Sequence, residues 1–317
     1  MNERELIEKA DIALSDLVSN GGLMPVEAND RFVRQILDDT VFLKEARQVR
    51  MKGPRMEINK IGFESRVLKP ANQGTISTPE RGETGTRALV RADRSAPTTS
   101  KITLETKEVI AEVDLPYEVI EDSLEGGDLD AAAFQQTVLD LLAQRVAYDL
   151  EEAIVLGDTG SGDAYLALQD GIIALAESNI VNHGGDPMNP DLFASMIKAL
   201  PTKYHSRLQA MKFYVSKTKE IDYRMAIATR QTQLGDSLLT GTAPVSALGI
   251  QMATAAHMPT STAILTNPKN IILGIQRNMR MEFERIARER VIAIIVSMRF
   301  AVAFEEEDLV VKAINIG

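Results

Sequence analysis

Three glycines and two aspartates between residues 157 and 163 are the first residues whose types could bind a ligand. The stretch reads Gly-Asp-Thr-Gly-Ser-Gly-Asp, and the backbone amides of a glycine-rich turn can cradle a phosphate. A phosphate loop precedes a helix, whereas these glycines follow a helical pattern, and no Gly-Lys-Ser/Thr is present. Asp158 and Asp163 also lack the alternating oxygen ligands of a calcium loop. We therefore interpret the glycines as the exit of a helix.

Side chains that could act as acid, base or nucleophile are isolated from one another. His183, His205 and His257 have no partner at the spacing of a metal site. The chain has no cysteine, which excludes disulfides, thiolate metal sites and cysteine nucleophiles. Adjacent carboxylates such as Glu121-Asp122 and Glu151-Glu152 are typical of solvated faces. The sequence predicts no catalytic residue, no metal site and no cofactor.

Composition narrows the class of protein further. The 317 residues carry a formal net charge of -10, which argues against a surface that grips phosphate backbones. Tryptophan is absent, so no stacking platform for nucleic acid is expected. The most apolar stretch, Val291–Met298, is far shorter than the ~20 residues that span a bilayer as a helix, and the N-terminus is not a secretory signal. We expect a cytosolic protein of two domains or one elaborated domain.

One long helix is the element around which the rest of the chain is arranged. Apolar residues recur at three- and four-residue steps, which predicts one buried stripe along a helix over 129–156. The stripe consists of Phe134, Val138, Leu141, Leu142, Val146, Leu150, Ala153 and Ile154. Asp128 or Asp130 can cap its N-terminus, and Gly157 can follow its last turn. At ~1.5 Å per residue this helix spans roughly 42 Å, so we expect it to act as a strut.

Two helical patterns precede it at the N-terminus. Leu6, Ala10, Ala13, Leu14 and Leu17 form one apolar stripe, which Gly21-Gly22 ends. A second helical pattern covers 29–47 and ends before Gly53-Pro54.

Residues 60–104 then form an unusually long stretch rich in glycine, proline, serine and threonine. Loops above ~15 residues are uncommon inside compact domains. Eight basic and four acidic residues leave this stretch at +4, whereas ten acidic residues and one lysine leave 105–130 at -9. Adjacent blocks of opposite charge indicate either a local salt-bridged face or a basic loop that binds the acidic region of another copy.

The rest of the chain alternates short helices and strands. We expect a strand over 102–113 with a phase slip, a flexible exit after the long helix and a short helix within 170–179. A helix begins at Pro190 with Asn189 as its cap, and another begins at Lys217 with Ser216 as its cap. Further strands are expected at 212–215, 279–283, 291–304 and 309–316.

In this order the elements resemble those of tailed-bacteriophage major capsid proteins. The residues that carry the resemblance are the helix Leu142–Ile154 with the glycines behind it, and the strands from Arg290 to Phe304. The resemblance implies an α+β fold of the Hong Kong 97 type, with a long spine helix, an extended loop, a peripheral domain and an axial domain.

The resemblance also implies a division of the chain. Residues 1–50 would form an N-terminal arm, and 60–104 the extended loop. Residues 51–59, 105–160 and 279–305 would form the peripheral domain with its spine helix at 129–156. The axial domain would take 161–278, and 306–317 would add a closing strand.

The function that the resemblance implies is assembly, not catalysis. Subunits of this family form hexamers and pentamers that close into an icosahedral shell around double-stranded DNA, which the shell encloses without sequence-specific binding. We expect the basic loop of one copy to contact the acidic region of a neighbour. The predicted contact residues are Arg81, Arg87, Arg91, Arg94, Glu118, Glu121, Asp122 and Glu125.

Several partners and alternatives follow from the same resemblance. A separate scaffolding protein and a portal are expected, and a covalent link through Lys60 or Lys69 is not. The protein would be a virion component that assembles in the host cytoplasm, with no membrane contact. One alternative is an encapsulin-type nanocompartment shell, filled with cargo protein. A second alternative, from a different class, is an α/β enzyme that acts on a phosphorylated small molecule through 157–163.

Overall fold

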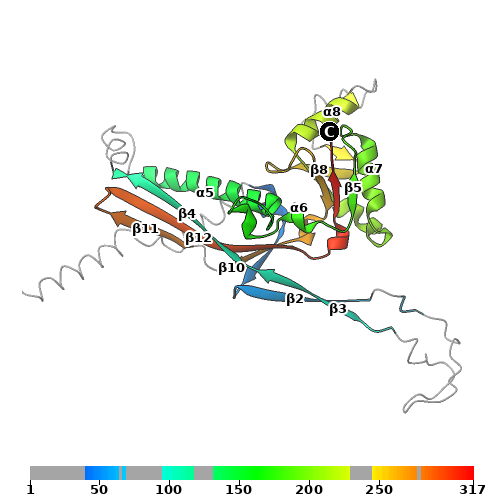
Figure 1. Ribbon diagram of the computed structural model, residues 1–317, viewed down its shortest axis with the longest axis horizontal. Coiled ribbons are helices and arrows are strands. Elements are labelled where there is room, and N and C mark those ends of the chain that lie inside the picture. The colour runs from blue at the N-terminus through cyan, green and yellow to red at the C-terminus, as the bar shows by residue number, and fades with distance from the viewer. Residues whose placement is uncertain (1–39, 64–65, 69–94, 118–130, 229–244, 277–279) are drawn as a thin grey trace, which may run out of the picture. The chain divides into compact units, whose positions relative to one another are not determined.

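The computed structural model describes residues 40–63, 66–68, 95–117, 131–228, 245–276 and 280–317. They form two compact units, of which the smaller comprises 55–104 and the larger comprises the rest. The larger unit contains a five-stranded sheet, a six-stranded sheet and the long helix α5, and the smaller unit contains a two-stranded sheet. Figure 1 shows the course of these elements.

The long helix α5 spans Ala131–Leu156 without interruption, so the prediction of one helix is confirmed. Its 26 residues extend for about 39 Å. The predicted stripe is confirmed at Leu150 and Ile154, which are buried, but Leu141 is 61% exposed. The reason is that Ala143 and Ala147 form the centre of the buried face, and Leu141 lies on the opposite side of a 3.6-residue turn. Small side chains thus let the helix lie close to its neighbours.

Two glycines bring together the two ends of the loop that follows α5. A Cβ at Gly157 would lie 2.4 Å from the Gln169 carbonyl oxygen, and one at Gly171 would lie 2.6 Å from that of Ile154. The Gly171 amide donates to the Gly157 carbonyl at 2.8 Å, so the ends of the loop meet. Because only glycine allows this approach, the predicted flexible exit is instead a closed loop, fastened to the end of α5.

The five-stranded sheet is arranged around one long central strand. β12 (Val291–Phe304) pairs antiparallel with β11 (Arg280–Ile286), β10 (Ile271–Gln276) and β4 (Lys107–Pro116), and β1 (Arg47–Met51) pairs parallel with β10. β12 matches the predicted strand in full. The single strand predicted over 102–113 is instead two strands, because the chain passes at Thr106 from the two-stranded sheet to this one.

One face of this sheet forms a core with α5. Val296 and Met298 of β12 and Met281 of β11 are buried there together with Leu142 and Leu150 of the helix. Alternation along each strand directs the intervening side chains to the other face. Figure 1 shows α5 running along β4 and β12.

The six-stranded sheet has the order β5-β13-β9-β6-β8-β7. Its strands are β5 (Ile180–Asn182), β6 (Lys212–Val215), β7 (Ser246–Ala247), β8 (Ile250–Thr254), β9 (Ala263–Thr266) and β13 (Val311–Ile314). Helix α7 (Pro190–Ala199), the 3-10 helix η3 (Thr202–Ala210) and helix α8 (Lys217–Ala228) pack on it. Phe193 lies edge-on to Phe213 and Tyr223, with ring centroids 4.6 and 5.0 Å away. Aromatic side chains from three elements therefore fill this core.

The predicted helix starts in this half of the chain are confirmed. Asn189 accepts a hydrogen bond from the Leu192 amide at 2.9 Å, and Pro190 opens α7. Ser216 accepts one from the Lys219 amide at 3.3 Å at the start of α8. Both side chains thus satisfy amides that a helix start leaves free.

Helix α3 (Val41–Glu45) joins the first described residues to α5 and to the six-stranded sheet. Glu151 of α5 is buried and accepts a hydrogen bond from the Phe42 amide at 3.4 Å. Burial raises the pKa of the Glu151 carboxyl, and the bonds from the Phe42 and Val41 amides oppose that rise. At the other end of α3, Glu45 accepts from Lys212 at 2.6 Å and from the Tyr214 hydroxyl at 2.8 Å.

The structure corrects one of two helix predictions and confirms the other. Of the helical pattern predicted over 29–47, residues 29–39 lie outside the described part of the chain. The described part is helical only at α3 and ends at Glu45, because Arg47 already pairs with Ile272 as the first residue of β1. The short helix expected within 170–179 is confirmed as α6 (Ile172–Leu175), which follows a 3-10 turn, η2 (Leu166–Leu168).

The smaller unit is a hairpin of β2 (Arg55–Gly62) and β3 (Thr98–Glu105). Lys101 Nζ lies 3.1 Å from a Glu57 carboxylate oxygen, and Arg55 lies 3.4 Å from the other. The hydrogen bond from Lys101 is the main cause of the lowered pKa of Glu57.

Candidate assembly surfaces

The predicted contact residues lie outside the described part of the chain. This applies to the four arginines at 81, 87, 91 and 94 and to the four acidic residues at 118, 121, 122 and 125. The contact between the basic loop and the acidic segment therefore stays a prediction. The described surfaces that border these segments show what the chain presents beside them.

The loop behind α5 uses its aspartates to hold its own backbone. Asp158 accepts from the Gly160 amide at 2.8 Å, Asp163 from the Tyr165 amide at 2.9 Å, and Asp170 from the Thr159 amide at 2.8 Å. Among the described residues, no three His, Asp or Glu side chains are grouped closely enough to hold a metal ion. These carboxylates thus close turns, as asparagine and aspartate commonly do.

The three histidines are widely separated. Rings of His183 and His205 contact the Pro187 and Leu200 carbonyl oxygens at 3.1 and 3.0 Å. His257 lies against the Tyr148 ring at 4.1 Å between centroids, and burial is the main cause of its lowered pKa. His183 and His205 thus bond to the backbone, whereas the buried Nε2 of His257 has no hydrogen-bond partner among the described residues, and the three histidines form no joint site.

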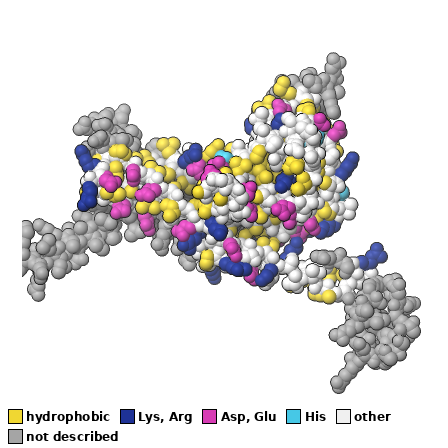
Figure 2. All heavy atoms as spheres, in the orientation of Figure 1, with side chains coloured by type: hydrophobic (Ala, Val, Ile, Leu, Met, Phe, Trp, Pro, Cys, Tyr) yellow, Lys and Arg dark blue, Asp and Glu magenta, His cyan; other side chains and the backbone are white. Residues whose placement is uncertain are grey.

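The face of the five-stranded sheet opposite α5 mixes acidic and apolar side chains. Glu108, Ile110, Glu112 and Asp114 alternate along β4 and are all exposed, Ile110 by 66%. Arg299 of β12 binds Glu108 at 2.7 Å. Figure 2 shows apolar and charged side chains interspersed where α5, β4 and β11 meet the solvent. The strand thus presents both acidic and apolar side chains to the solvent.

The hairpin unit exposes apolar side chains near its open end. Ile61, Phe63 and Leu68 are exposed by 71%, 58% and 85%. With Val67, which is also exposed, these are four large apolar groups within eight residues, which exceeds the scattered single exposures of an ordinary surface.

The junction between the two sheets consists of two chain crossings that lie side by side. One crossing runs from β9 through η4 (Pro268–Asn270) to β10, and the other from β12 through η5 (Glu307–Leu309) to β13. The buried Asn270 side chain accepts from the Glu306 amide at 2.8 Å and donates to the Glu306 carbonyl at 2.9 Å. The Glu305 amide donates to the Asn270 carbonyl at 2.8 Å. Asn270 thus clasps one crossing to the other.

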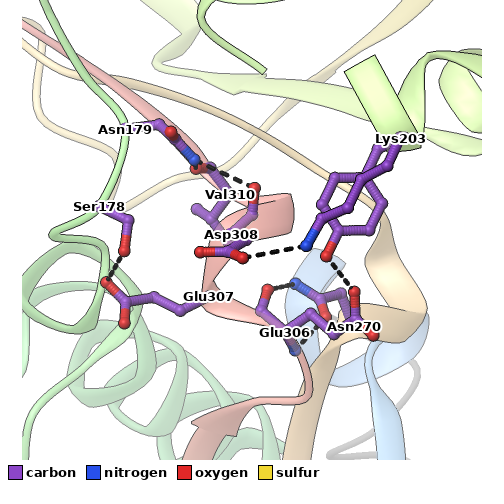
Figure 3. Close-up of polar contacts among 9 residues, drawn as sticks. Ser178, Asn179, Lys203, Asn270, Glu306, Glu307, Asp308 and Val310 are labelled. Atoms are coloured by element: carbon purple, nitrogen blue, oxygen red, sulfur yellow. Dashed lines mark hydrogen bonds and ion pairs between the residues drawn. The ribbon is translucent and has the colours of Figure 1, made fainter. Parts of the chain in front are cut away.

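The acidic turn at Glu305–Asp308 connects this clasp to its surroundings (Figure 3). Glu305 binds Arg47 of β1 at 3.1 Å, and Glu306 accepts from the Tyr204 hydroxyl. Glu307 accepts from the Ser178 hydroxyl at 2.8 Å, and Asp308 binds Lys203 at 3.2 Å. The four carboxylates therefore contact three separate regions of the larger unit. Exposed ion pairs contribute little each, so among these polar contacts the buried Asn270 clasp should contribute most.

The comparison that decides the family is a match to a family model. The model described as "Phage capsid family" matches residues 20–313. The chain belongs to the phage capsid family. A capsid protein is a structural subunit of a shell, so the interpretation as a small-molecule enzyme acting through 157–163 is excluded, in agreement with the turn-forming role of those residues.

One curated relative of this capsid protein covers its full length. A Bacillus subtilis (strain 168) protein, YqbE, whose name describes a prophage capsid protein, is 37% identical over 328 residues. The match covers 100% of this chain and 99% of that protein.

Solved structures confirm the Hong Kong 97-type fold. The satellite phage P4 procapsid with its size determination (Sid) protein aligns with a TM-score of 0.62 at 13% identity, covering 98% of both chains. The capsid of an empty GTA particle aligns at 0.60 and 13% identity, and that of Mycobacterium phage Bobi at 0.59 and 14%. Each of the last two matches covers 88% of this chain and 91% of the other. This capsid protein is therefore a virion component that forms a shell with copies of itself.

The clasp of this capsid protein has no signal in the local sequence. The run 305–308 lies between two predicted strands and is acidic, which by itself indicates only a turn. The pattern Asn267-Pro268 is the signal for the short helix η4, since Asn267 caps it by accepting from the Lys269 amide at 3.0 Å. Nothing in the sequence marks Asn270 as the partner of Glu306.

Proposed function

We propose that this capsid protein assembles as hexamers and pentamers that close into an icosahedral shell around double-stranded DNA. The observation that carries the proposal is the incomplete cover of the five-stranded sheet and of the β2–β3 hairpin. The described chain leaves Ile110 on the sheet and Phe63 on the hairpin in water. Repeated copies can bury such surfaces on one another, because closed assemblies are built from self-complementary contacts.

The charge pattern supports a particular contact between copies. The loop within 60–104 carries +4 and the segment 105–130 carries -9. The described part of that acidic segment, on β4, has Glu112 and Asp114 exposed to solvent. We propose that the loop of one copy lies along the acidic segment of its neighbour, where complementary charge fixes the register of the two subunits.

The proposal extends to domains and partners. Residues 1–50 would serve as an arm, 161–278 as the axial domain and 306–317 as its closing strand, around the peripheral domain of 51–59, 105–160 and 279–305. A separate scaffolding protein and a portal would complete assembly in the host cytoplasm. A net charge of -10 suits a wall that encloses DNA without binding it tightly.

Electron microscopy of the recombinant protein, alone and with its scaffolding protein, tests this function. We expect closed regular shells with five-fold vertices, and nucleic acid inside particles recovered from infected cells. Particles that hold an enzyme cargo in place of nucleic acid would support the encapsulin-type alternative and contradict our proposal.

Charge reversal tests the contact between copies. We expect the triple variant Arg87→Glu, Arg91→Glu, Arg94→Glu to lower shell yield by about tenfold or more, since a loss of 1.4 kcal/mol per contact is already a factor of ten. Yield is measured by sedimentation and particle counting, and subunit folding by circular dichroism.

The matched control reverses three exposed basic residues of the six-stranded half. Lys198→Glu, Arg207→Glu and Lys269→Glu change the net charge equally. We expect this control to retain most of the shell yield. Equal losses in both variants would mean that net charge, and not the proposed contact, governs assembly.

A further inference from the structure

The loop between β8 and β9, residues 255–262, packs on the long helix α5. Ala255 and Met258 of this loop are buried and belong to the same core as Leu150 of the helix. The Met258 amide donates to the Ala255 carbonyl at 3.3 Å, so the loop makes a tight turn that contains His257. The loop is therefore a direct contact between the six-stranded sheet and the helix that covers the five-stranded sheet.

His257 meets α5 through two contacts with one residue. Its imidazole lies against the Tyr148 ring, with 4.1 Å between the ring centroids. It also forms a hydrogen bond with the Tyr148 backbone. The Nε2 atom of His257 is buried and has no hydrogen-bond partner among the described residues. The bond to the Tyr148 carbonyl therefore comes from Nδ1, and Nε2 carries no proton in the neutral ring.

A second proton on this imidazole is costly while the loop is docked. Protonation turns Nε2 into a charged donor, and a buried donor without an acceptor loses its hydration without compensation. Burial is accordingly the main cause of the lowered pKa of His257. An imidazole in water has no such penalty, so the released loop binds the proton more tightly than the docked loop does.

Charged side chains of α5 modify this penalty without removing it. Glu152 and Asp149 favour the imidazolium and act to raise the pKa of His257, but burial outweighs them. Arg145, which lies over the Tyr148 ring at 5.4 Å, acts in the same direction as burial. Arg145 also pairs with Asp149 at 2.8 Å, so part of the favourable negative charge is already neutralised.

Charged groups of the neighbouring elements already have partners of their own. Glu151 of α5 accepts a hydrogen bond from the backbone of α3, and Lys217 at the start of α8 pairs with Glu220. Glu151 and Lys217 line a cavity of about 340 Å³ that also borders Ala256. The loop 255–262 contains no titratable side chain besides His257. A shift of the turn towards this cavity therefore meets open space.

We propose that His257 is a pH-sensitive latch, which holds the 255–262 loop on α5 while it is neutral and releases the loop when it is protonated. The lowered pKa sets the sign, since the docking free energy is fully present above the ordinary histidine value of 6.5 and is lost as the pH falls through the docked value. Release loosens the tie between the two sheets, while the Asn270 clasp still joins them. The latch acts within one subunit and does not depend on the proposed contact between copies.

Thiol reactivity measures the release, because the chain has no cysteine of its own. In Met258→Cys the single thiol lies beneath the docked loop, and a dithiodipyridine reagent, which reacts in acid, modifies it when the loop opens. We expect its rate, divided by that of the same chain in denaturant, to rise about threefold or more from about pH 8 to about pH 5. Ala255→Cys is a second probe of the same loop if Met258→Cys lowers the free energy of unfolding.

Two matched variants decide whether His257 causes the change. His257→Gln, combined with Met258→Cys, keeps a donor for the Tyr148 carbonyl but gains no charge, so it should remove the rise. Met196→Cys makes the same substitution in α7, within the core of the six-stranded sheet, and its rate should not rise. A rise that persists in His257→Gln would assign the pH dependence to another group, and an equal rise at position 196 would show global unfolding. Either result would overturn the proposal.

Charge variants on α5 test the electrostatic origin of the latch. Glu152→Gln removes a carboxylate that favours the imidazolium, so docked His257 is harder to protonate and the rise in rate between the two pH values should increase. Arg145→Gln removes an unfavourable charge and frees Asp149, so the rise should become smaller. A change of the same sign in both variants would contradict the latch.

Discussion

The two sheets of the larger unit differ in how completely the chain covers them. In the six-stranded sheet, every residue of β9 is buried and only Lys212 of β6 is partly exposed. In the five-stranded sheet, β4 has no fully buried residue, although it pairs with β12 along its whole length. β4 lies at the edge of its sheet and pairs with β12 alone, whereas β6 and β9 lie in the middle of theirs. The difference separates central strands that stabilise the subunit from an edge strand that offers surface to other molecules.

Truncation of an aromatic core residue should have the largest effect. We expect Phe213→Ala to lower the free energy of unfolding by about 3–5 kcal/mol, because Phe213 of β6 is fully buried and packs edge-on against Phe193. Far-UV circular dichroism in a denaturant titration measures it, since the chain has no tryptophan. Ile110→Ala on β4 should change the same quantity by under about 0.5 kcal/mol. Similar losses of stability in the two variants would remove the distinction between the buried central strand β6 and the exposed edge strand β4.

Loss of the Asn270 clasp should lower the free energy of unfolding by an intermediate amount, and it should weaken the connection between the two sheets. Asn270→Ala leaves the Glu306 amide and carbonyl without their side-chain partner, which costs about 1–3 kcal/mol in a buried site. We expect faster hydrogen exchange at Glu306, measured by mass spectrometry of its peptide. Asn182→Ala is the matched control, because Asn182 also makes side-chain hydrogen bonds but is exposed. Unchanged exchange in Asn270→Ala would show that the backbone alone holds the crossings together.

Substitution of two buried glutamates by glutamine should change the free energy of unfolding least, and with opposite signs. The raised pKa of Glu151 means that the folded chain favours its protonated form, so its contribution to stability is present at low pH and is lost as pH rises through the folded pKa. We expect Glu151→Gln to be more stable than the natural chain at pH 7 by about 1 kcal/mol or less. The difference should disappear as the pH falls below the usual range of a carboxyl.

Glu220 of α8 provides the opposite case. Burial would raise the pKa of its carboxyl, but the hydrogen bonds from Lys217 and Arg224 outweigh burial and lower it. Its contribution is therefore present above the unfolded pKa and is lost as pH falls through the folded one. Glu220→Gln should be less stable than the natural chain at pH 7, with a loss that vanishes in acid. Both variants are compared with the natural chain by their unfolding midpoints between pH 3 and 7. A stability change of the same sign in both variants would contradict the opposite pKa shifts of Glu151 and Glu220.

Local signals predicted the elements of this fold well. The single helix α5, the strand β12, and the caps Asn189 and Ser216 all follow from periodicity and from side chains within a few residues. The predictions were wrong where a contact with residues far along the chain determines the local structure. The exposure of Leu141 depends on which face of α5 meets the sheets, and Arg47 is a strand residue because β10, over 220 positions later, pairs with it.

The candidate surfaces were less accessible to sequence reasoning. The charge blocks at 60–104 and 105–130 are visible as composition, but composition does not show that β4 turns its glutamates away from α5. The clasp between Asn270 and Glu306 joins residues 36 positions apart, and asparagine has many other uses at a surface. Pairing across such separations depends on the arrangement of both sheets, which no local pattern specifies.

The position of the two last strands has a consequence for the timing of folding. β12 and β13 come at the end of the element order, yet β12 lies between β4 and β10 and β13 lies between β5 and β9. During translation neither sheet can close until these strands have left the ribosome, however early α5 and α7 form. An incomplete chain would therefore lack both cores together. Synthesis of these two strands thus acts as a checkpoint, because a product that terminates before them cannot present the surfaces of a folded subunit.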